Sequence, residues 1–131
     1  MSQENVDTMR ESLTTFEHRD KDGWRGLCDA EIEAVPVGEW PEGKLRGHDA
    51  VWDFLIAVDE PWEPGRWELN EVTDGGDNVA ARMQRDLRGK SSGIEVEYDY
   101  WVVFSFRDGS ICRVEWFEHQ REALEAAGLP E

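Results

Sequence analysis

Few residues of this chain are of the types that carry out catalysis, and none of them forms a recognised motif. The three histidines, His18, His48 and His119, are scattered, and the cysteines Cys28 and Cys112 are far apart. The sequence has no His-Glu-x-x-His zinc motif, Cys-x-x-Cys pair, Walker loop, Gly-x-Ser-x-Gly motif or dinucleotide fingerprint. We therefore expect no metal site and no cofactor.

One carboxylate lies where it could face an apolar pocket. Residues 111–118 alternate as a strand, with Val114 and Trp116 on one face, and Glu118 continues that face. Burial in an apolar pocket would keep a carboxyl group protonated near neutral pH, which suits proton transfer. At the rim of a sheet, in water, Glu118 would have no such role. Both alternatives remain open.

Apolar residues at helical spacing predict three helices in the N-terminal half. The first covers residues 3–19, a break at residues 20–23 precedes a short second helix, and the third begins at His48 and ends before residues 61–65. The apolar stripes of the first and third helices consist of Val6, Met9, Leu13 and Phe16, and of Val51, Phe54, Leu55 and Val58.

Alternating residues predict strands at 31–37, 67–72, 78–87, 94–106 and 111–118, followed by a short helix at 120–127. Between residues 36 and 47 we expect a loop over the open end of the fold. Its Trp40 is either a lid that closes over a ligand or an anchor that packs down. In the strand at 94–106 both faces are apolar, because Trp101 and Val103 alternate with Tyr98, Tyr100 and Phe104. This strand should be covered on both sides.

Length and charge exclude several classes of protein. We expect a chain of 131 residues to form a single domain over residues 1–131. With 30 acidic and 14 basic residues its net charge is −16, which repels nucleic acid and anionic lipid. The acidic surface suits a high-salt source or general solubility equally. Since no signal peptide or membrane-spanning segment is present, we expect a cytoplasmic protein with no membrane partner.

Several stretches resemble one known family. The turn FRDGSI with the strand after it, the ending REALEAAGL and the upstream SSGIEVE resemble the SnoaL-like branch of the nuclear transport factor 2-like superfamily. The resemblance covers nearly the whole chain. It implies an α+β fold, a cone-shaped curved mixed sheet with three N-terminal-half helices on its concave face and a short C-terminal helix. It also implies a pocket between helices and sheet, and a homodimer through the convex face, where Trp101, Val103 and Phe117 would be covered.

The same resemblance excludes two familiar reactions. The two aspartates of the steroid isomerases correspond to Val35 and Val102, which cannot transfer a proton. In the limonene epoxide hydrolases the last-strand aspartate corresponds to Trp116, and the mid-sheet pair falls near residues 79–81. An inward orientation of Arg82 remains open, because the match there is uncertain by one or two residues.

The SnoaL-type cyclases resemble this chain most, and they use a pocket aspartate or histidine for acid–base catalysis. The nearest candidates are Glu118 and His119. Two functions stay open: acid–base chemistry on an apolar cyclic substrate, as in a cyclase or isomerase, or a non-catalytic module that binds a small hydrophobic molecule or a partner protein. The predicted ligand-binding residues are Phe16, Trp40, Phe54, Leu55, Tyr98, Tyr100, Phe104 and Trp116.

Overall fold

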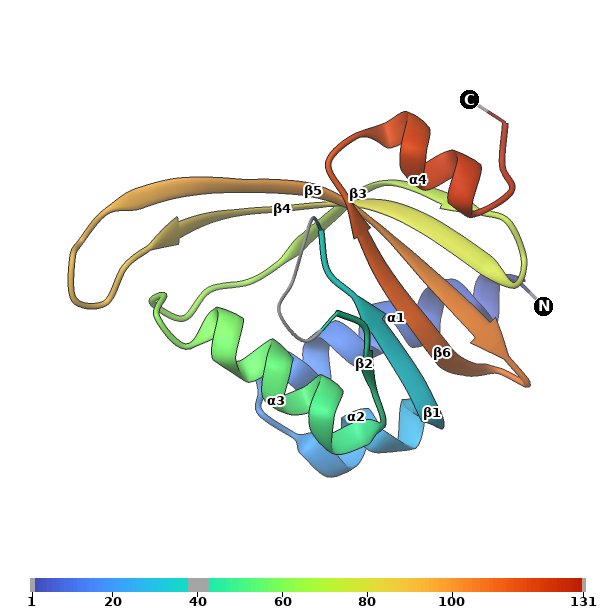
Figure 1. Ribbon diagram of the computed structural model, residues 1–131, viewed down its shortest axis with the longest axis horizontal. Coiled ribbons are helices and arrows are strands. Elements are labelled where there is room, and N and C mark those ends of the chain that lie inside the picture. The colour runs from blue at the N-terminus through green and yellow to red at the C-terminus, as the bar shows by residue number, and fades with distance from the viewer. Residues whose placement is uncertain (1, 38–42, 131) are drawn as a thin grey trace.

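The computed structural model describes residues 2–37 and 43–130, and within them it has four helices and six strands (Figure 1). In chain order these are α1 (Ser2–Glu17), α2 (Lys21–Leu27), β1 (Cys28–Val35), β2 (Leu45–Arg46), α3 (His48–Asp59), β3 (Glu68–Asp74), β4 (Asn78–Arg88), β5 (Glu95–Arg107), β6 (Ser110–Phe117) and α4 (Gln120–Ala126). The predicted α+β fold is confirmed. The two-residue β2 lies inside the segment that was expected to be loop only.

The strands form one mixed sheet in the order β2-β1-β6-β5-β4-β3. All neighbours are antiparallel except β1 and β6, which are parallel. Figure 1 shows a curved, open sheet with α1, α2 and α3 on one side and α4 on the other. We call the side that faces α1–α3 the inner face and the side that faces α4 the outer face.

The turn between β5 and β6, together with an irregularity just beyond it, fixes which residues share the inner face. Asp108 and Gly109 have φ values of 54° and 79°, the left-handed conformation that two-residue hairpin turns need. The turn pairs Phe106 with Ile111, and a register shift between Phe106 and Ser105 then pairs Val102 with Trp116. Directly paired residues lie on the same face of a sheet, so the inward residues of β5 and Trp116 of β6 face the same helices.

The main core lies between the inner face and the three helices. Its fully buried members include Met9 of α1, Ile32 of β1, Val51 of α3, and Val79 and Val102 of the sheet. The apolar stripes predicted for the first and third helices supply much of the helical half of this core, because apolar side chains at spacings of three and four lie on one face of a helix. The exception is Val58 near the end of α3, which is 42% exposed.

A second, smaller core lies on the outer face. Ala123, Leu124 and Ala127 of the C-terminal segment pack against Trp101 and Val103, which are 7% and 3% exposed. From the sequence we predicted that a partner subunit covers these two residues, and for Trp101 and Val103 that prediction was wrong. The helix α4 of the same chain covers them, a packing that residue periodicity does not specify.

Candidate functional site

A cavity of about 260 Å³ lies between the inner face of the sheet and helices α1–α3. Its wall is almost entirely apolar and combines side chains from all three helices and most of the strands. Seven of the predicted ligand-binding residues lie on this wall: Phe16, Phe54, Leu55, Tyr98, Tyr100, Phe104 and Trp116. The eighth, Trp40, lies outside the described residues.

Sequence reasoning missed several members of the wall. Met83 and Leu87 line the cavity from β4, and their spacing of four, which puts both on one face of a strand, was a usable signal. The other missed aromatic residues are Trp24, Trp62 and Trp67. Trp62 and Trp67 lie at the two ends of the connection between α3 and β3, where no periodicity indicates which way a side chain points.

Ring-to-ring contacts hold the aromatic part of the wall in place. Phe54 of α3 and Trp116 of β6 meet edge to face, with ring centroids 6.0 Å apart. Tyr98 contacts Trp67 on one side and Tyr100 on the other, each with centroids 4.7 Å apart. Such T-shaped pairs are a preferred geometry for aromatic side chains. One group of contacts joins α3 to β6, and the other joins β5 to the segment just before β3, so packing between elements shapes the wall of the cavity.

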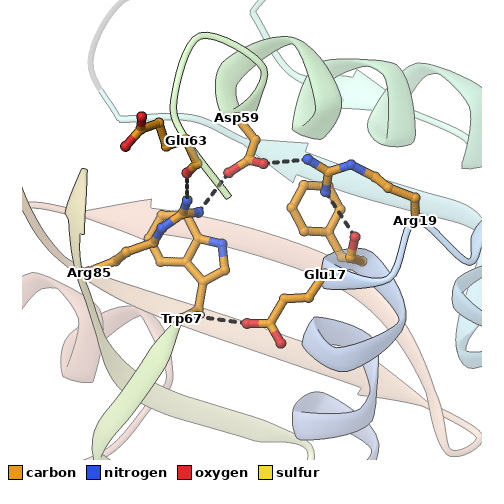
Figure 2. Close-up of polar contacts among 7 residues, drawn as sticks. Glu17, Arg19, Asp59, Glu63, Trp67 and Arg85 are labelled. Atoms are coloured by element: carbon orange, nitrogen blue, oxygen red, sulfur yellow. Dashed lines mark hydrogen bonds and ion pairs between the residues drawn. The ribbon is translucent and has the colours of Figure 1, made fainter. Parts of the chain in front are cut away.

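One charged residue of the described chain lines this apolar cavity. Asp59, the last residue of α3, is 7% exposed. Figure 2 shows its carboxylate between two arginines: Arg85 Nη1 lies 2.9 Å from Oδ1, and Arg19 Nη2 lies 2.5 Å from Oδ2. Burial of a single charge is costly unless the charge is paired and hydrogen-bonded. The two guanidinium groups meet that requirement for Asp59.

The sequence contains a signal for this ion pair. On α3, Asp59 follows Val51 and Leu55 at intervals of four, so an acidic residue continues the buried stripe. On β4, Arg85 lies midway between the inward-facing Met83 and Leu87. Two opposite charges that each occupy a buried position predict one another as partners.

Arg85 also connects the site to its surroundings. Its Nη2 donates a hydrogen bond to the carbonyl oxygen of Glu63, and its guanidinium group lies 4.9 Å from the centre of the Trp67 ring (Figure 2). The backbone N–H of Trp67 donates to the carboxylate of Glu17 at 2.8 Å. These contacts join the ends of α1 and α3, the strand β4 and the segment 63–67 around one end of the cavity.

Burial keeps two other titratable groups of the wall uncharged. Desolvation raises the pKa of the Cys28 thiol to about 12. It also raises the pKa of the Tyr98 hydroxyl, with a smaller contribution from Tyr100. At neutral pH the cavity therefore presents a neutral thiol and a neutral phenol, neither of which is an activated nucleophile.

The two predicted catalytic residues lie elsewhere. The strand β6 ends at Phe117, so Glu118 is not part of the inward-facing strand, and both Glu118 and His119 are exposed. Neither of them lines the cavity. Of the two alternatives left open for Glu118, its exposure agrees with a position at the rim of the sheet, because the chain leaves the sheet one residue before it and His119 becomes the N-cap of α4.

The orientation of Arg82 is now defined. It lies on the outer face, where its Nε and Nη2 donate to the two carboxylate oxygens of Asp99 at 2.8 and 2.6 Å. Its Nη1 donates to Glu71 at 3.0 Å. The arginine of β4 on the inner face is instead Arg85, three residues later, because an odd spacing on a strand reverses the face.

The described residues show no metal centre and no membrane-spanning helix. Within residues 2–37 and 43–130, no group of three or more His, Cys, Asp or Glu side chains is arranged to hold a metal ion. None of the helices in these ranges has both the length and the apolar character needed to cross a bilayer.

Comparison with known proteins identifies the family. The model of the SnoaL-like domain matches residues 9–114, and the chain belongs to this family. A search of curated proteins finds no match. Among solved structures, an NTF2-like protein from Burkholderia xenovorans LB400 is 26% identical, with 97% of each chain covered and a TM-score of 0.75.

Two further structures share the fold at lower identity. A protein from Jannaschia sp. CCS1 described as a SnoaL-like polyketide cyclase is 18% identical, with 100% of this chain and 96% of that chain covered and a TM-score of 0.80. TerC, crystallised with polyporic acid, is 22% identical, with 93% of this chain and 98% of that chain covered and a TM-score of 0.75.

Proposed function

We propose that this SnoaL-like domain binds a small, largely apolar, ring-containing molecule in the cavity on its inner face. The observation that carries the proposal is the composition of the wall, which is almost entirely apolar, rich in aromatic rings and marked by one charged residue, Asp59. Small-molecule sites combine apolar and aromatic walls with a few polar groups in this way.

The size of the cavity limits the ligand. An engineered apolar cavity of about 150 Å³ takes up benzene. The cavity here measures about 260 Å³, which leaves room for a molecule of roughly two rings. The crystallisation of TerC with polyporic acid supports a small-molecule ligand for a domain with this fold.

Binding without catalysis is the function that the wall supports best. A general base needs a basic group within reach of the substrate. The candidates on the wall are poorly suited, because Cys28 and Tyr98 are held neutral and the carboxylate of Asp59 is engaged by two arginines. These observations favour a ligand-binding module over a cyclase or isomerase.

Acid–base chemistry by Glu118 and His119 is the second candidate, and the resemblance to SnoaL-type cyclases favours it. Both residues lie outside the cavity wall, so this function would require a substrate that extends to the surface beyond β6. With a substrate in hand, Glu118→Gln should abolish turnover and leave ligand affinity close to unchanged. Equal activity of wild type and variant would remove Glu118 from the reaction.

Homodimerisation remains a proposal with a reduced basis. Three outer-face residues were expected to be covered by a partner subunit: Trp101, Val103 and Phe117. Because α4 covers the first two, only the half-buried Phe117 of these three still supports a dimer through this face. Native mass spectrometry at micromolar concentration measures the mass of the oligomer and of any small molecule that stays bound to it. We expect twice the mass of one chain, and a bare single-chain mass would contradict the dimer.

Adjacent residues on β6 allow a matched test of the cavity. Trp116 lines the cavity, whereas the next residue, Phe117, packs on the outer face. We expect calorimetric titration with 2-methylnaphthalene to show saturable binding at one site per chain. Trp116→Ala should weaken this binding about tenfold or more, because removal of a large aromatic contact is costly. Phe117→Ala should leave it unchanged, and equal loss in both variants would contradict the proposed site.

A further inference from the structure

We propose that Asp59 selects the ligand: the cavity takes an aromatic molecule that carries a neutral hydroxyl group, and that hydroxyl donates a hydrogen bond to the Asp59 carboxylate. This inference rests on the proposed function, since it concerns the same cavity. It adds the chemical class of the ligand and the residue that recognises it.

The carboxylate of Asp59 has unused capacity as an acceptor. An ionised carboxylate offers about four lone-pair positions on its two oxygens. Donors from the described residues, 2–37 and 43–130, occupy two of these, one on each oxygen: Arg85 Nη1 and Arg19 Nη2. The residue lies on the cavity wall, and its side chain is 8% exposed. A hydrogen-bond donor on the ligand would therefore find a partner there that water barely reaches.

The arginines do not compete for this contact. Neither Arg19 nor Arg85 lines the cavity, although both bind the carboxylate of Asp59 (Figure 2). Of this charged group, the wall thus contains the acceptor, Asp59, and neither of its two arginine donors. The hydroxyls of Tyr98 and Tyr100 also lie on wall residues, but a phenol both donates and accepts, so these residues do not discriminate.

The charges around Asp59 favour a neutral donor over a charged one. A ligand ammonium group would approach two guanidinium groups, the buried Arg85 and the half-exposed Arg19, and like charges repel most strongly where water is excluded, as at Arg85. A phenolate or carboxylate would instead meet the carboxylate of Asp59 itself. A neutral hydroxyl avoids both repulsions, and a hydrogen bond to a charged acceptor is stronger than one between neutral groups.

Three ligands of the same ring size test this inference on the wild-type protein. They are 2-naphthol, which carries a neutral hydroxyl, 2-methylnaphthalene, which replaces the hydroxyl with a methyl group, and 2-naphthylmethylammonium, which is cationic at pH 7. Calorimetric titration at pH 7 gives the dissociation constant of each. We expect 2-naphthol to bind at least about tenfold more tightly than either of the others, as for a hydrogen bond to a charged group.

The outcomes separate the two proposals. If none of the three compounds binds, the cavity is not a ligand site and the proposed function fails together with this inference. If 2-methylnaphthalene binds as tightly as 2-naphthol, or more tightly, the cavity binds ligands and only the role of Asp59 is overturned. Tightest binding of the ammonium compound overturns the preference for a neutral donor.

A variant pair assigns the selectivity to the residue. Asp59→Asn removes the charge, and Glu60→Gln makes the same change at an exposed neighbour as a control. We expect Asp59→Asn to lose most of the preference for 2-naphthol while its affinity for 2-methylnaphthalene stays within about threefold; a purely structural role would weaken both ligands equally. Retained selectivity in a folded Asp59→Asn protein would overturn the assignment, and the three-ligand comparison on the wild type decides the question if this variant does not fold.

Discussion

Two arginines on one strand form ion pairs that differ in their exposure to water, because they lie on opposite faces of the sheet. Arg82 and Arg85 lie three residues apart on β4, and each binds an aspartate. On the outer face, the side chains of Arg82 and Asp99 are 36% and 30% exposed. On the inner face, those of Arg85 and Asp59 are 5% and 8% exposed. Both pairs join a guanidinium group to an aspartate carboxylate, but their contact with water differs.

The difference teaches that these pairs have different roles. An exposed pair contributes little to stability, because water and salt screen it and long side chains lose freedom when they form it. A buried pair adds little in total, since desolvation offsets attraction, but loss of one partner leaves an uncompensated charge in the interior. The outer pair is therefore dispensable, whereas the inner pair fixes one end of the cavity.

Matched substitutions in the two aspartates should give the largest difference. Asp59→Ala leaves Arg85 buried without its carboxylate, and we expect a loss of about 3–5 kcal/mol in the free energy of unfolding. Asp99→Ala leaves Arg82 near the surface with Glu71 still bound, and we expect a loss below about 1 kcal/mol. Urea denaturation of both variants measures the two values, and equal losses would show that burial does not distinguish the pairs.

Two leucines extend the comparison from charge to packing. Leu124 of α4 is 4% exposed in the outer-face core, and Leu55 of α3 is half-buried on the cavity wall. Leu124→Ala should cost about 2–4 kcal/mol of stability, as for other buried leucines, and leave the affinity for 2-methylnaphthalene unchanged.

Leu55→Ala should do the reverse, with a smaller loss of stability and a clear loss of affinity, because the side chain contacts the ligand space. Urea denaturation and calorimetric titration on the same preparations measure both quantities. If Leu124→Ala also weakened ligand binding, the two faces would not be independent.

Alkaline pH should reveal the thiol on the inner face. Because burial raises the pKa of Cys28 from 9.0 to about 12, the folded state keeps a proton that the unfolded chain loses above pH 9. Stability is therefore fully present below pH 9 and falls as pH rises toward 12, by up to about 1.4 kcal/mol per pH unit for one group.

Cys28→Ala should make this decline shallower. The half-buried Cys112 provides the control: desolvation raises its pKa as well, but it is less completely buried, so Cys112→Ala should change the slope less. Urea denaturation between pH 8 and 10.5 measures the slopes. Tyr98 acts in the same direction above pH 10, so some decline should remain in both variants. A steeper change for Cys112→Ala would contradict the assigned burial.

Much of the fold could be predicted because residue spacing reports it directly. The alternation of Tyr98, Tyr100 and Phe104 on β5 placed these residues on one face, and the structure puts all three on the cavity wall. The turn at Asp108 and Gly109 was recognisable from residue type, since both positions need a positive φ. Local patterns of this kind depend only on neighbours in the chain.

The parts that failed depend on distant contacts. Trp101 and Val103 were recognised as buried, but the sequence does not say that α4 covers them. Asp59 meets Arg85 and Arg19 across 26 and 40 residues, so a local pattern can place each charge on a buried face but does not show that the two lie in contact. Glu118 was placed inward by extending a strand that ends at Phe117. The signal that was available and not used is the position of Asp59, which continues the stripe of Val51 and Leu55 on α3.

The tryptophan indole N–H signals provide the most direct test of an inner-face ligand cavity. Trp62, Trp67 and Trp116 line the cavity, whereas Trp101 lies under α4 on the outer face. In a two-dimensional nitrogen–proton NMR titration with 2-naphthol, we predict saturable shifts of the indole signals of Trp67 and Trp116, with that of Trp101 unchanged. Shifts centred on Trp101, or no saturable shift of any cavity tryptophan, would contradict a ligand site on the inner face.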